Sequence, residues 1–198
     1  STRTRRWAIT AITEEEIKQL PRKEFNGEIY LIDNYSKLDT ALPLLEDKKI
    51  LGFDTETRPS FKKAKNNDIA LMQLATSDEA FLFRLNRIGL PEPLKELCRN
   101  DSVKKIGLAL KDDLSGLRNL NNFQPGGFID LQDMAKELEI KNNGLKKLAA
   151  IILKYRISKS RSQRLSNWER ETLTPKQVKY AATDAWVCHE LYQVMKKL

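Results

Sequence analysis

Hydrophobic residues in the first two thirds of the chain occur mainly in short runs separated by polar turns, a pattern typical of β-strands. Six such runs predict strands at residues 28–32, 49–55, 69–75, 80–85, 103–108 and 128–130. The second run is apolar at consecutive positions, which predicts a strand buried on both faces.

Other segments repeat their apolar residues every three to four positions, which predicts helices. They cover residues 13–20, 36–46, 93–98, 112–120, 131–138, 145–155 and a long last helix from 174 onward. Thr174, Pro175 and Gln177 mark the start of that last helix as a capping box with proline in its first turn. Residues 156–173 are polar and are expected to form a loop. Strands interspersed with helices predict an α/β fold, a mixed sheet flanked by helices.

The composition is that of a globular protein, with 198 residues of which 40% are hydrophobic and 31% are charged. We expect residues 1–27 to form a basic tail with one short helix, ahead of a domain at residues 28–198. The longest apolar run, at residues 149–153, is far shorter than the roughly 20 residues that a membrane span needs, so no membrane partner is expected. Two cysteines, Cys98 and Cys188, make no disulfide framework, and with no secretory signal visible we expect a cytoplasmic location.

Positive charge is concentrated in one part of the chain. The net charge is +8, and residues 141–180 alone hold eleven basic and two acidic residues, a local charge of +9. A basic block on an otherwise balanced protein favours a polyanionic partner, nucleic acid first. The alternative is a solvated, lysine-rich surface.

Two carboxylates follow the buried second strand. Side chains alternate along a strand, so Asp54 and Glu56 project from the same face as Ile50 and Gly52. Two like charges close together on a core strand repel each other and lose solvation, and a divalent cation removes both costs. The alternative is a strand that runs out into solvent and carries two ordinary surface acids.

A third carboxylate lies on the apolar stripe of the last helix. Asp184 follows Ala181 by three residues and precedes Cys188 by four, and Tyr180 is one turn earlier on the same side. An ionised carboxylate that faces the core must be paired or metal-bound. The alternative is an aspartate at the edge of the stripe, paired with a lysine.

A fourth carboxylate stands where a strand meets a helix. Asp113 shares a helical face with Leu117 and Leu120 and is expected to point inward, whereas Asp112 is expected to point outward. The alternative is a pair of acids that caps the helix. Three separate segments therefore each direct a carboxylate toward one interior.

Three motifs in this order resemble the DEDDy 3′–5′ exonuclease family, in particular its ribonuclease D and Werner-type exonuclease branch. They are GFDTET at residues 52–57, KIGLALKDDL at residues 105–114 and YAATDA at residues 180–185. Residues 161–163 and 166–168 are also similar to that branch, and the resemblance spans residues 29–198. It implies a ribonuclease H-like fold with a five-stranded mixed sheet flanked by helices.

The resemblance also implies two divalent cations, Mg²⁺ or Mn²⁺, and no small-molecule cofactor. Asp54, Glu56 and Asp184 match the ligands of one ion, and Asp54 and Asp113 match the groups that hold the second. Tyr180 matches the residue that orients the attacking water.

The implied function is a two-metal exonuclease that hydrolyses phosphodiester bonds from the 3′ end and releases nucleoside 5′-monophosphates. The expected partner is single-stranded or 3′-recessed DNA or RNA. Werner-type relatives carry a Trp after the D-x-E motif that can touch a terminal base, but here Thr57, Arg58 and Pro59 follow, so base stacking does not carry over. His189 is interpreted as structural, since a lone histidine supplies neither a triad nor a ligand cluster.

Arg161, Gln163, Arg164 and Trp168 lie just before the last helix and are predicted to contact nucleic acid, with Trp168 as a stacking surface for a base. The alternative for Trp168 is a place in the core, where tryptophan is found more often than on a binding surface. Two rival functions stay open. One is a catalytically inactive nucleic-acid-binding module of the same fold, and the other is an adaptor that presents the helix at residues 145–155 to a protein partner.

Overall fold

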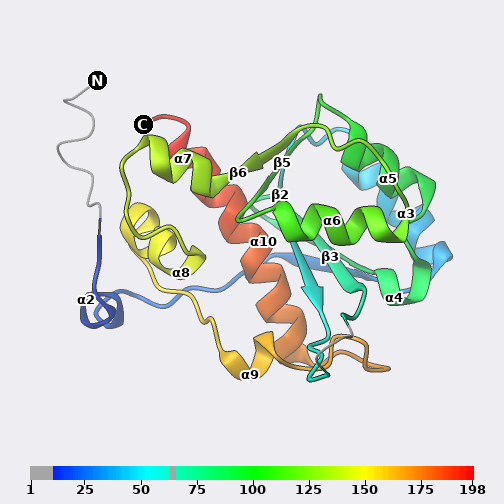
Figure 1. The fold of residues 1–198 in the computed structure, drawn as a ribbon, viewed down its shortest axis with the longest axis horizontal. Coiled ribbons are helices and arrows are strands. Elements are labelled where there is room, and N and C mark those ends of the chain that lie inside the picture. Colours follow the sequence, from blue (N-terminus) through cyan, green and yellow to red (C-terminus); the bar gives the residue numbers. More distant parts are fainter. Residues whose placement is uncertain (1–10, 63–65) are drawn as a thin grey trace.

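The centre of the protein is a six-stranded sheet, seen in a computed structural model that describes residues 11–62 and 66–198 (Figure 1). The strands follow the order β1-β4-β3-β2-β5-β6. Their bounds are β1 Glu28–Ile32, β2 Ile50–Thr57, β3 Ile69–Ala75, β4 Glu79–Arg84, β5 Lys104–Gly107 and β6 Phe128–Asp130. The β2–β3 and β3–β4 pairs are antiparallel, whereas the β1–β4, β2–β5 and β5–β6 pairs are parallel. The prediction of a mixed sheet flanked by helices is therefore confirmed.

The sheet has one strand more than the five that the family resemblance implies. All six apolar runs form strands, and both outer ones find a partner: β1 pairs with β4, and β6 pairs with β5. Joining a free sheet edge satisfies backbone N–H and C=O groups that burial would otherwise leave without partners. The count of five strands is wrong for this reason.

The helices largely follow the predicted segments. Their bounds are α2 Glu14–Lys18, α3 Tyr35–Leu45, α4 Leu85–Ile88, α5 Glu92–Arg99, α6 Lys111–Leu120, α7 Leu131–Glu137, α8 Leu145–Leu148, η1 Ala149–Leu153, α9 Arg161–Arg164 and α10 Pro175–Met195. The short α4 was not expected, and α9 forms inside the stretch expected to be a loop. The segment expected as one helix at residues 145–155 is α8 followed by the π-helical turn η1, which ends at Lys154 in the left-handed region.

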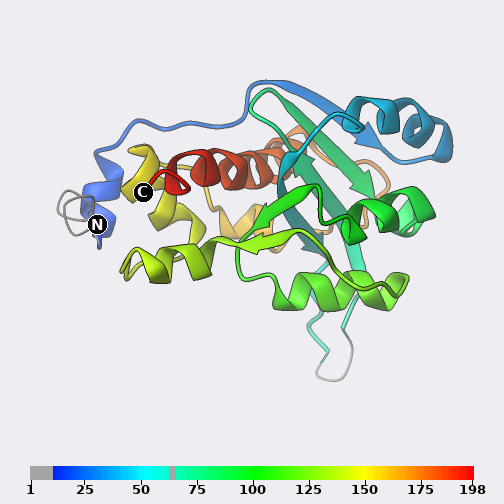
Figure 2. The ribbon, with the colours of Figure 1, turned by 90° about the horizontal axis from the view of Figure 1, so that it is seen from above.

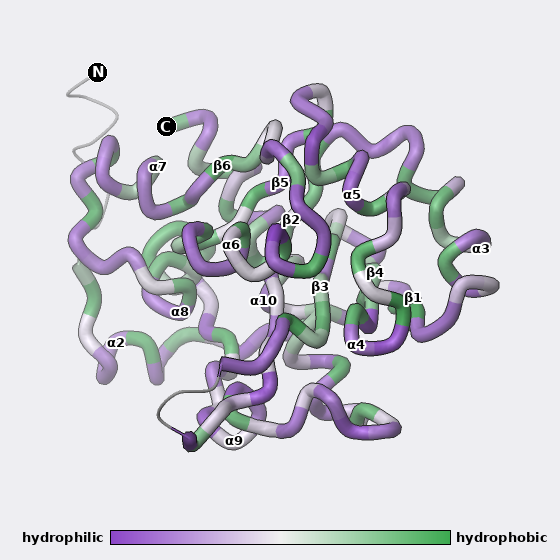
Figure 3. Tube along the Cα trace, turned by 45° about the vertical axis from the view of Figure 1, so that its right-hand side comes forward, coloured by the Kyte–Doolittle hydropathy of each residue, from purple (hydrophilic) through white to green (hydrophobic). Residues whose placement is uncertain are grey.

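The sheet has different coverings on its two faces (Figure 2). α10 packs against β2, β3, β4 and β5, while apolar residues of α3, α4, α5 and α6 form one hydrophobic cluster with Leu51 and Phe53 of β2. β3 and β4 are almost wholly buried between these layers, and Figure 3 shows hydrophobic segments along both strands. Buried between layers, β2 can therefore bring polar side chains into the interior.

Residues 11–27 run along the domain. Ile17 and Phe25 are each 1% exposed, and the backbone N–H of Phe25 donates to Thr183 Oγ1 of α10 at 3.0 Å. We call residues 21–25 the strap, because they cross from α2 to α10 and are fixed at both ends. The boundary at residue 28 stays a prediction, and the first ten residues of the expected basic tail lie outside the described residues.

Two smaller expectations concern cysteines and membrane spans. Cys98 and Cys188 are both buried and free, so they form no disulfide, as expected. In the part of the chain that the structure describes, no helix is both long and apolar enough to cross a bilayer.

Candidate active site

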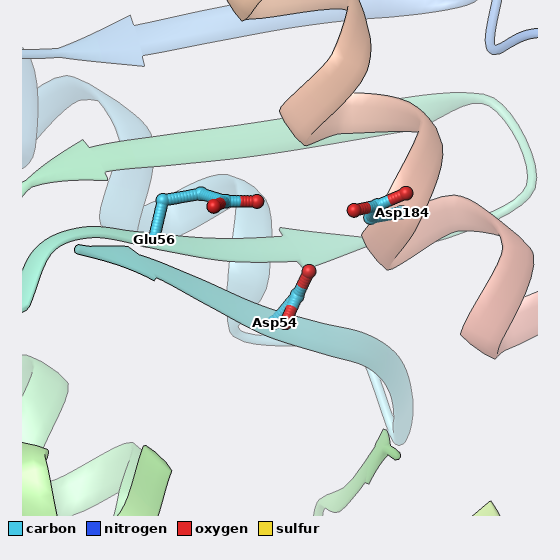
Figure 4. A group of neighbouring side chains, drawn as sticks. All are labelled: Asp54, Glu56 and Asp184. Atoms are coloured by element: carbon cyan, nitrogen blue, oxygen red, sulfur yellow. The ribbon is translucent and has the colours of Figure 1, made fainter. Parts of the chain in front are cut away.

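Three carboxylates from two elements meet beside the centre of the sheet. Carboxylate oxygens of Asp54, Glu56 and Asp184 all lie within 4.8 Å of one another, and Figure 4 shows the three side chains converging from β2 and α10. We call these three residues the carboxylate cluster. Glu56 is 8% exposed and Asp184 only 1%, so water has little access to their charges. The structure thus brings together three of the four carboxylates predicted as metal ligands.

The cluster forms because α10 approaches β2 very closely. Gly52 precedes Asp54 by two residues, on the face of β2 that α10 covers, and a Cβ atom there would overlap the carbonyl oxygen of Ala185. The alanines at 181, 182 and 185 are each fully buried against the sheet. Small residues on both elements therefore set the spacing that places Asp184 within reach of Asp54 and Glu56.

The electrostatics of the cluster favour protonation or cation binding. Burial, followed by the charges of Asp184 and Asp113, raises the pKa of Asp54 well above its usual range. Burial and then Asp54 do the same for the pKa of Glu56. Each raised pKa reflects the cost of holding unpaired negative charge away from water, which a divalent cation would remove.

One carboxylate oxygen of the cluster has no hydrogen-bond donor among the described residues. Asp184 Oδ1 is buried and accepts no hydrogen bond, while Oδ2 accepts one from Lys159 Nζ at 2.8 Å. Carboxylate oxygens are the ligands that Mg²⁺ and Mn²⁺ prefer. The donor set and the unpartnered oxygen both fit a divalent cation, which would be held by Asp54, Glu56 and Asp184.

Lys159 is a site residue that sequence reasoning missed. Besides the ion pair with Asp184, its ammonium group lies 4.9 Å from the centre of the Tyr180 ring. Burial opposes the charged form of Lys159, but the charges of Asp184, Tyr180 and Asp54 outweigh it, and its pKa is raised. A lysine partner for Asp184 was an open alternative, but in the sequence Lys159 is only one of eleven cations in the basic block. An irregular segment has no periodicity that shows where a side chain points.

Asp113 lies close to the cluster but is not one of its members. The phase prediction is confirmed, since Asp113 is half-buried and Asp112 is exposed. Its Oδ1 accepts a hydrogen bond from the hydroxyl of Thr55, which projects from the face of β2 opposite to Asp54. Asp113 therefore reaches the end of β2 from the α6 side. Burial raises the pKa of Asp113 to about 6 even though the Thr55 hydrogen bond opposes that rise.

Tyr180 lies one turn before Asp184 on α10, as the spacing predicts. It is 7% exposed, and its ring packs at 6.1 Å from the ring of Trp168. Burial and the Asp184 charge raise the pKa of Tyr180 to about 12, so the phenol keeps its proton at neutral pH. A protonated phenol can both donate and accept a hydrogen bond.

The four residues predicted to contact nucleic acid separate into two groups. Arg161 and Arg164 are exposed and Gln163 is half-exposed, all on α9. Trp168 is fully buried behind Tyr180, with its indole Nε1 donating to the carbonyl of Arg164 at 3.4 Å. The prediction that Trp168 stacks on a base does not agree with this burial, because no face of the ring is free. Its ring supports Tyr180 from behind.

The α9 helix separates two cavities. One, of about 470 Å³, has Gln163 and Tyr180 in its lining, and the other, of about 610 Å³, has Arg164, Thr57 and Arg58 in its lining. Each lining includes one residue close to the cluster in the chain, since Tyr180 precedes Asp184 by one helical turn and Thr57 follows Glu56. Of the four predicted contact residues, Gln163 and Arg164 therefore border different cavities, and Arg161 and Trp168 border neither.

The structure also bears on the structural role expected for His189 and on the adaptor hypothesis. His189 is 7% exposed and its Nδ1 lies 2.9 Å from Glu190 Oε2, which agrees with a structural role. The segment that the adaptor hypothesis would expose, α8 with η1, buries Leu148, Ala149 and Ile151 in the core. Its other large apolar residues, Leu145, Ile152 and Leu153, are partly buried and pack against the same core, which argues against the adaptor hypothesis.

Comparison with known proteins agrees with this geometry. The family described as 3′–5′ exonuclease matches residues 29–198. The mouse bifunctional 3′–5′ exonuclease/ATP-dependent helicase WRN is 33% identical over 187 residues, which is 90% of this chain but only 13% of the mouse protein. The chain therefore corresponds to a small part of that relative's length.

Solved structures show the same fold at lower identity. The EXO domain of Nibbler from Aedes aegypti superposes with a TM-score of 0.77 at 24% identity, covering 88% of this chain and 91% of that one. Ribonuclease D from Trypanosoma brucei, in complex with RNA U12, gives 0.72 at 18% identity, covering 91% and 64%. The fold is thus ribonuclease H-like, with six strands in its sheet. Its match over residues 29–198 places this chain in the 3′–5′ exonuclease family, and its carboxylate cluster is consistent with the DEDDy type of that family.

Proposed function

We propose that this chain hydrolyses phosphodiester bonds one nucleotide at a time from the 3′ end of a nucleic-acid strand and releases nucleoside 5′-monophosphates. The observation that carries the proposal is the carboxylate cluster, in which buried Glu56 and Asp184 converge with half-buried Asp54 and, within the described part of the chain, only one cation, Lys159, is paired with them. A cluster of carboxylates that can hold divalent cations is suited to cation-assisted attack on a phosphodiester.

The proposal includes two divalent cations, Mg²⁺ or Mn²⁺. Asp54, Glu56 and Asp184 would hold the first, and Asp54 with Asp113 would hold the second. When bound, such cations supply positive charge that polarises the phosphate and the attacking water. The role of the four carboxylates is to fix that charge at the end of β2.

Tyr180 is proposed to orient the attacking water. Its pKa of about 12 keeps the hydroxyl protonated at neutral pH, so it can donate to one oxygen while accepting from another. Lys159 acts as a positioning residue, because its ammonium group contacts both Asp184 and the Tyr180 ring. Together they place a hydrogen-bonding group beside the carboxylates.

The proposed substrate is a single-stranded or 3′-recessed strand of DNA or RNA. The structural neighbour from Trypanosoma brucei is described in complex with RNA, and the local charge of +9 at residues 141–180 favours a polyanion on this chain too. Arg161, Gln163 and Arg164 on α9 are proposed to contact its backbone.

The test uses oligonucleotides labelled at either end, as DNA and as RNA, blunt and recessed, with Mg²⁺, Mn²⁺ or chelator. A 5′-labelled strand should shorten in single-nucleotide steps, a 3′-labelled strand should release labelled mononucleotide at once, and chelator should stop both. Tight binding without any cleavage in either metal would instead identify the inactive binding module.

A further inference from the structure

The cavity beside Tyr180 has walls from three separate segments of the chain. Its volume is about 470 Å³, and it is lined by the strap at residues 22–24, by residues of the 158–163 segment and by the first turns of α10. The strap lies outside the family match at residues 29–198. We call this cavity the basic groove.

The groove has more cationic than anionic side chains in its lining. Its lining includes four cations and one carboxylate, namely Arg22, Lys23, Lys176, Lys179 and Glu24. Among residues 11–62 and 66–198, no carboxylate lies within 4.0 Å of any of the four cationic groups. Cations left without acidic partners in a concave surface attract a polyanion from solution.

The position of Lys176 adds to this excess. It lies in the first turn of α10, which contains no acidic residue. A helix N-terminus already carries partial positive charge, so a lysine there is unfavourable unless an anion is bound nearby. The hydroxyls of Ser158, Ser160 and Ser162 line the same space and supply further hydrogen-bond donors.

The strap is held rigidly against the rest of the groove. The N–H of Lys23 donates to the Arg156 carbonyl at 2.9 Å, and the N–H of Arg156 donates to the Pro21 carbonyl at 2.9 Å. Lys179 Nζ donates to the Phe25 carbonyl at 2.9 Å, which joins the strap directly to α10. A wall fixed before binding loses little entropy when a ligand arrives.

Tyr180 belongs both to the groove and to the site at the carboxylate cluster. A ligand with regularly spaced negative charges could therefore occupy the two together. We propose that the basic groove binds backbone phosphates of the same nucleic-acid strand, next to the nucleotide being removed, with Arg22, Lys23, Lys176 and Lys179 as their partners. This inference rests on the proposed exonuclease function and adds the strap to the substrate-binding surface.

The test compares two double variants that remove the same charge. Arg22→Ala/Lys176→Ala removes groove cations that make no side-chain hydrogen bond within the described residues, so the fold should persist. Lys37→Ala/Lys197→Ala removes two exposed lysines, one on α3 and one at the C-terminus. Thermal unfolding of both variants checks the fold.

Two measurements follow on each variant. The first is the ratio of kcat/KM for a 12-nucleotide strand to that for an unphosphorylated dinucleotide, whose only phosphate is the scissile one. The second is binding of the 12-mer, in an Asp54→Asn background, by fluorescence anisotropy across a salt series. The groove variant should lower the ratio about tenfold and reduce the slope of log K against log salt by about 1.4, since each phosphate contact on a single strand contributes about 0.7. The control variant should change neither.

Three outcomes would contradict or separate the claims. An unchanged ratio and an unchanged salt slope in the groove variant would overturn the inference. A second outcome is that a nucleoside 5′-monophosphate competes with the 12-mer for binding, that the groove variant alone abolishes this competition, and that strand length has no effect on kcat/KM. The groove would then bind a free nucleotide, and the inference that it binds the strand would be overturned. If the wild-type chain hydrolyses neither substrate, the proposed function fails, while the salt slope still decides whether the groove binds a strand.

Discussion

The carboxylate cluster and the basic groove meet at Tyr180, yet they are built in different ways. The cluster stands on β2 and α10, two long regular elements whose spacing is set by contact at Gly52. The groove is lined by the strap, by the segment at residues 158–163 and by only the beginning of α10. Carboxylates that repel one another must be held in place by regular secondary structure. Cations that bind a flexible nucleic-acid strand can instead lie on loops that are fixed by a few hydrogen bonds.

The largest effect should come from the cluster itself. Asp54→Asn removes the one carboxylate assigned to both cations and should lower kcat/KM by at least about 10³-fold, equivalent to roughly 4 kcal/mol. The fold should remain, because an amide relieves repulsion among buried charges. The matched control is Asp112→Asn, an exposed acid on α6, which should keep wild-type activity. Persistent activity of Asp54→Asn with Mg²⁺ or Mn²⁺ would end the assignment of the cluster as the active site.

A slightly smaller effect is expected from the spacing between β2 and α10. Gly52→Ala places a methyl group against the Ala185 carbonyl and should reduce the free energy of unfolding by about 3 kcal/mol, as measured in urea. Gly144→Ala is the control, because nothing lies within 4 Å of a Cβ at that position. Equal stability of the two variants would show that close packing at Gly52 does not hold α10 in place.

The third prediction concerns pH and metal. The pKa values of Asp54, Glu56 and Asp113 are raised in the folded chain, to about 6 for Asp113, so the folded state binds protons that the unfolded state releases. In chelator, stability should therefore be greatest below the unfolded pKa values and fall as pH rises through the folded ones, by about 3 kcal/mol for Asp113 alone.

Mn²⁺ should weaken or reverse this trend, because bound carboxylates must be deprotonated. Unfolding curves between about pH 5 and pH 8, with and without Mn²⁺, measure it, and Asp54→Asn should show a smaller slope in chelator. A chelated wild-type protein that grows more stable as pH rises over this range would contradict the electrostatic account of the cluster.

The smallest effect is expected at the outer edge of the groove. Arg161 is exposed on α9 and lines neither of the two cavities that α9 separates. Arg161→Ala should weaken oligonucleotide binding only about twofold to fourfold and lower the salt slope by about 0.7. Lys37→Ala provides the comparison. A tenfold loss at Arg161 would mean that the strand runs over the outside of α9 instead of through the groove.

Much of the fold was predictable because its signals are local. All six strand runs were identified, and the capping box of α10 is present, with Thr174 Oγ1 accepting from the Gln177 N–H at 3.1 Å. The number of strands in the sheet was not predicted correctly, because the pairing of β1 with β4 depends on whether the edge of β4 is open in the folded domain. The short α9 was also missed, because four polar residues carry no apolar stripe.

In the candidate site, the residues on regular elements were predictable and those on the irregular segment were not. Asp54, Glu56 and Asp184 were found because each lies at a position where strand or helix periodicity calls for an apolar side chain. Lys159 and Trp168 lie in the irregular segment before α10, where no periodicity says which side chain is buried. A lysine partner for Asp184 and a core position for Trp168 were both open alternatives, but the sequence did not identify Lys159 as that lysine or place Trp168 behind Tyr180.

The sequence by itself determined which side chains of β2 and α10 share a face, because helical and strand repeats are properties of the local backbone. Only the tertiary structure decided that Asp113 reaches the end of β2 from the opposite face and that the strap closes a groove beside Tyr180. Those arrangements depend on contacts between residues far apart in the chain, such as Phe25 with Thr183, whose free energy exists only once the domain has folded.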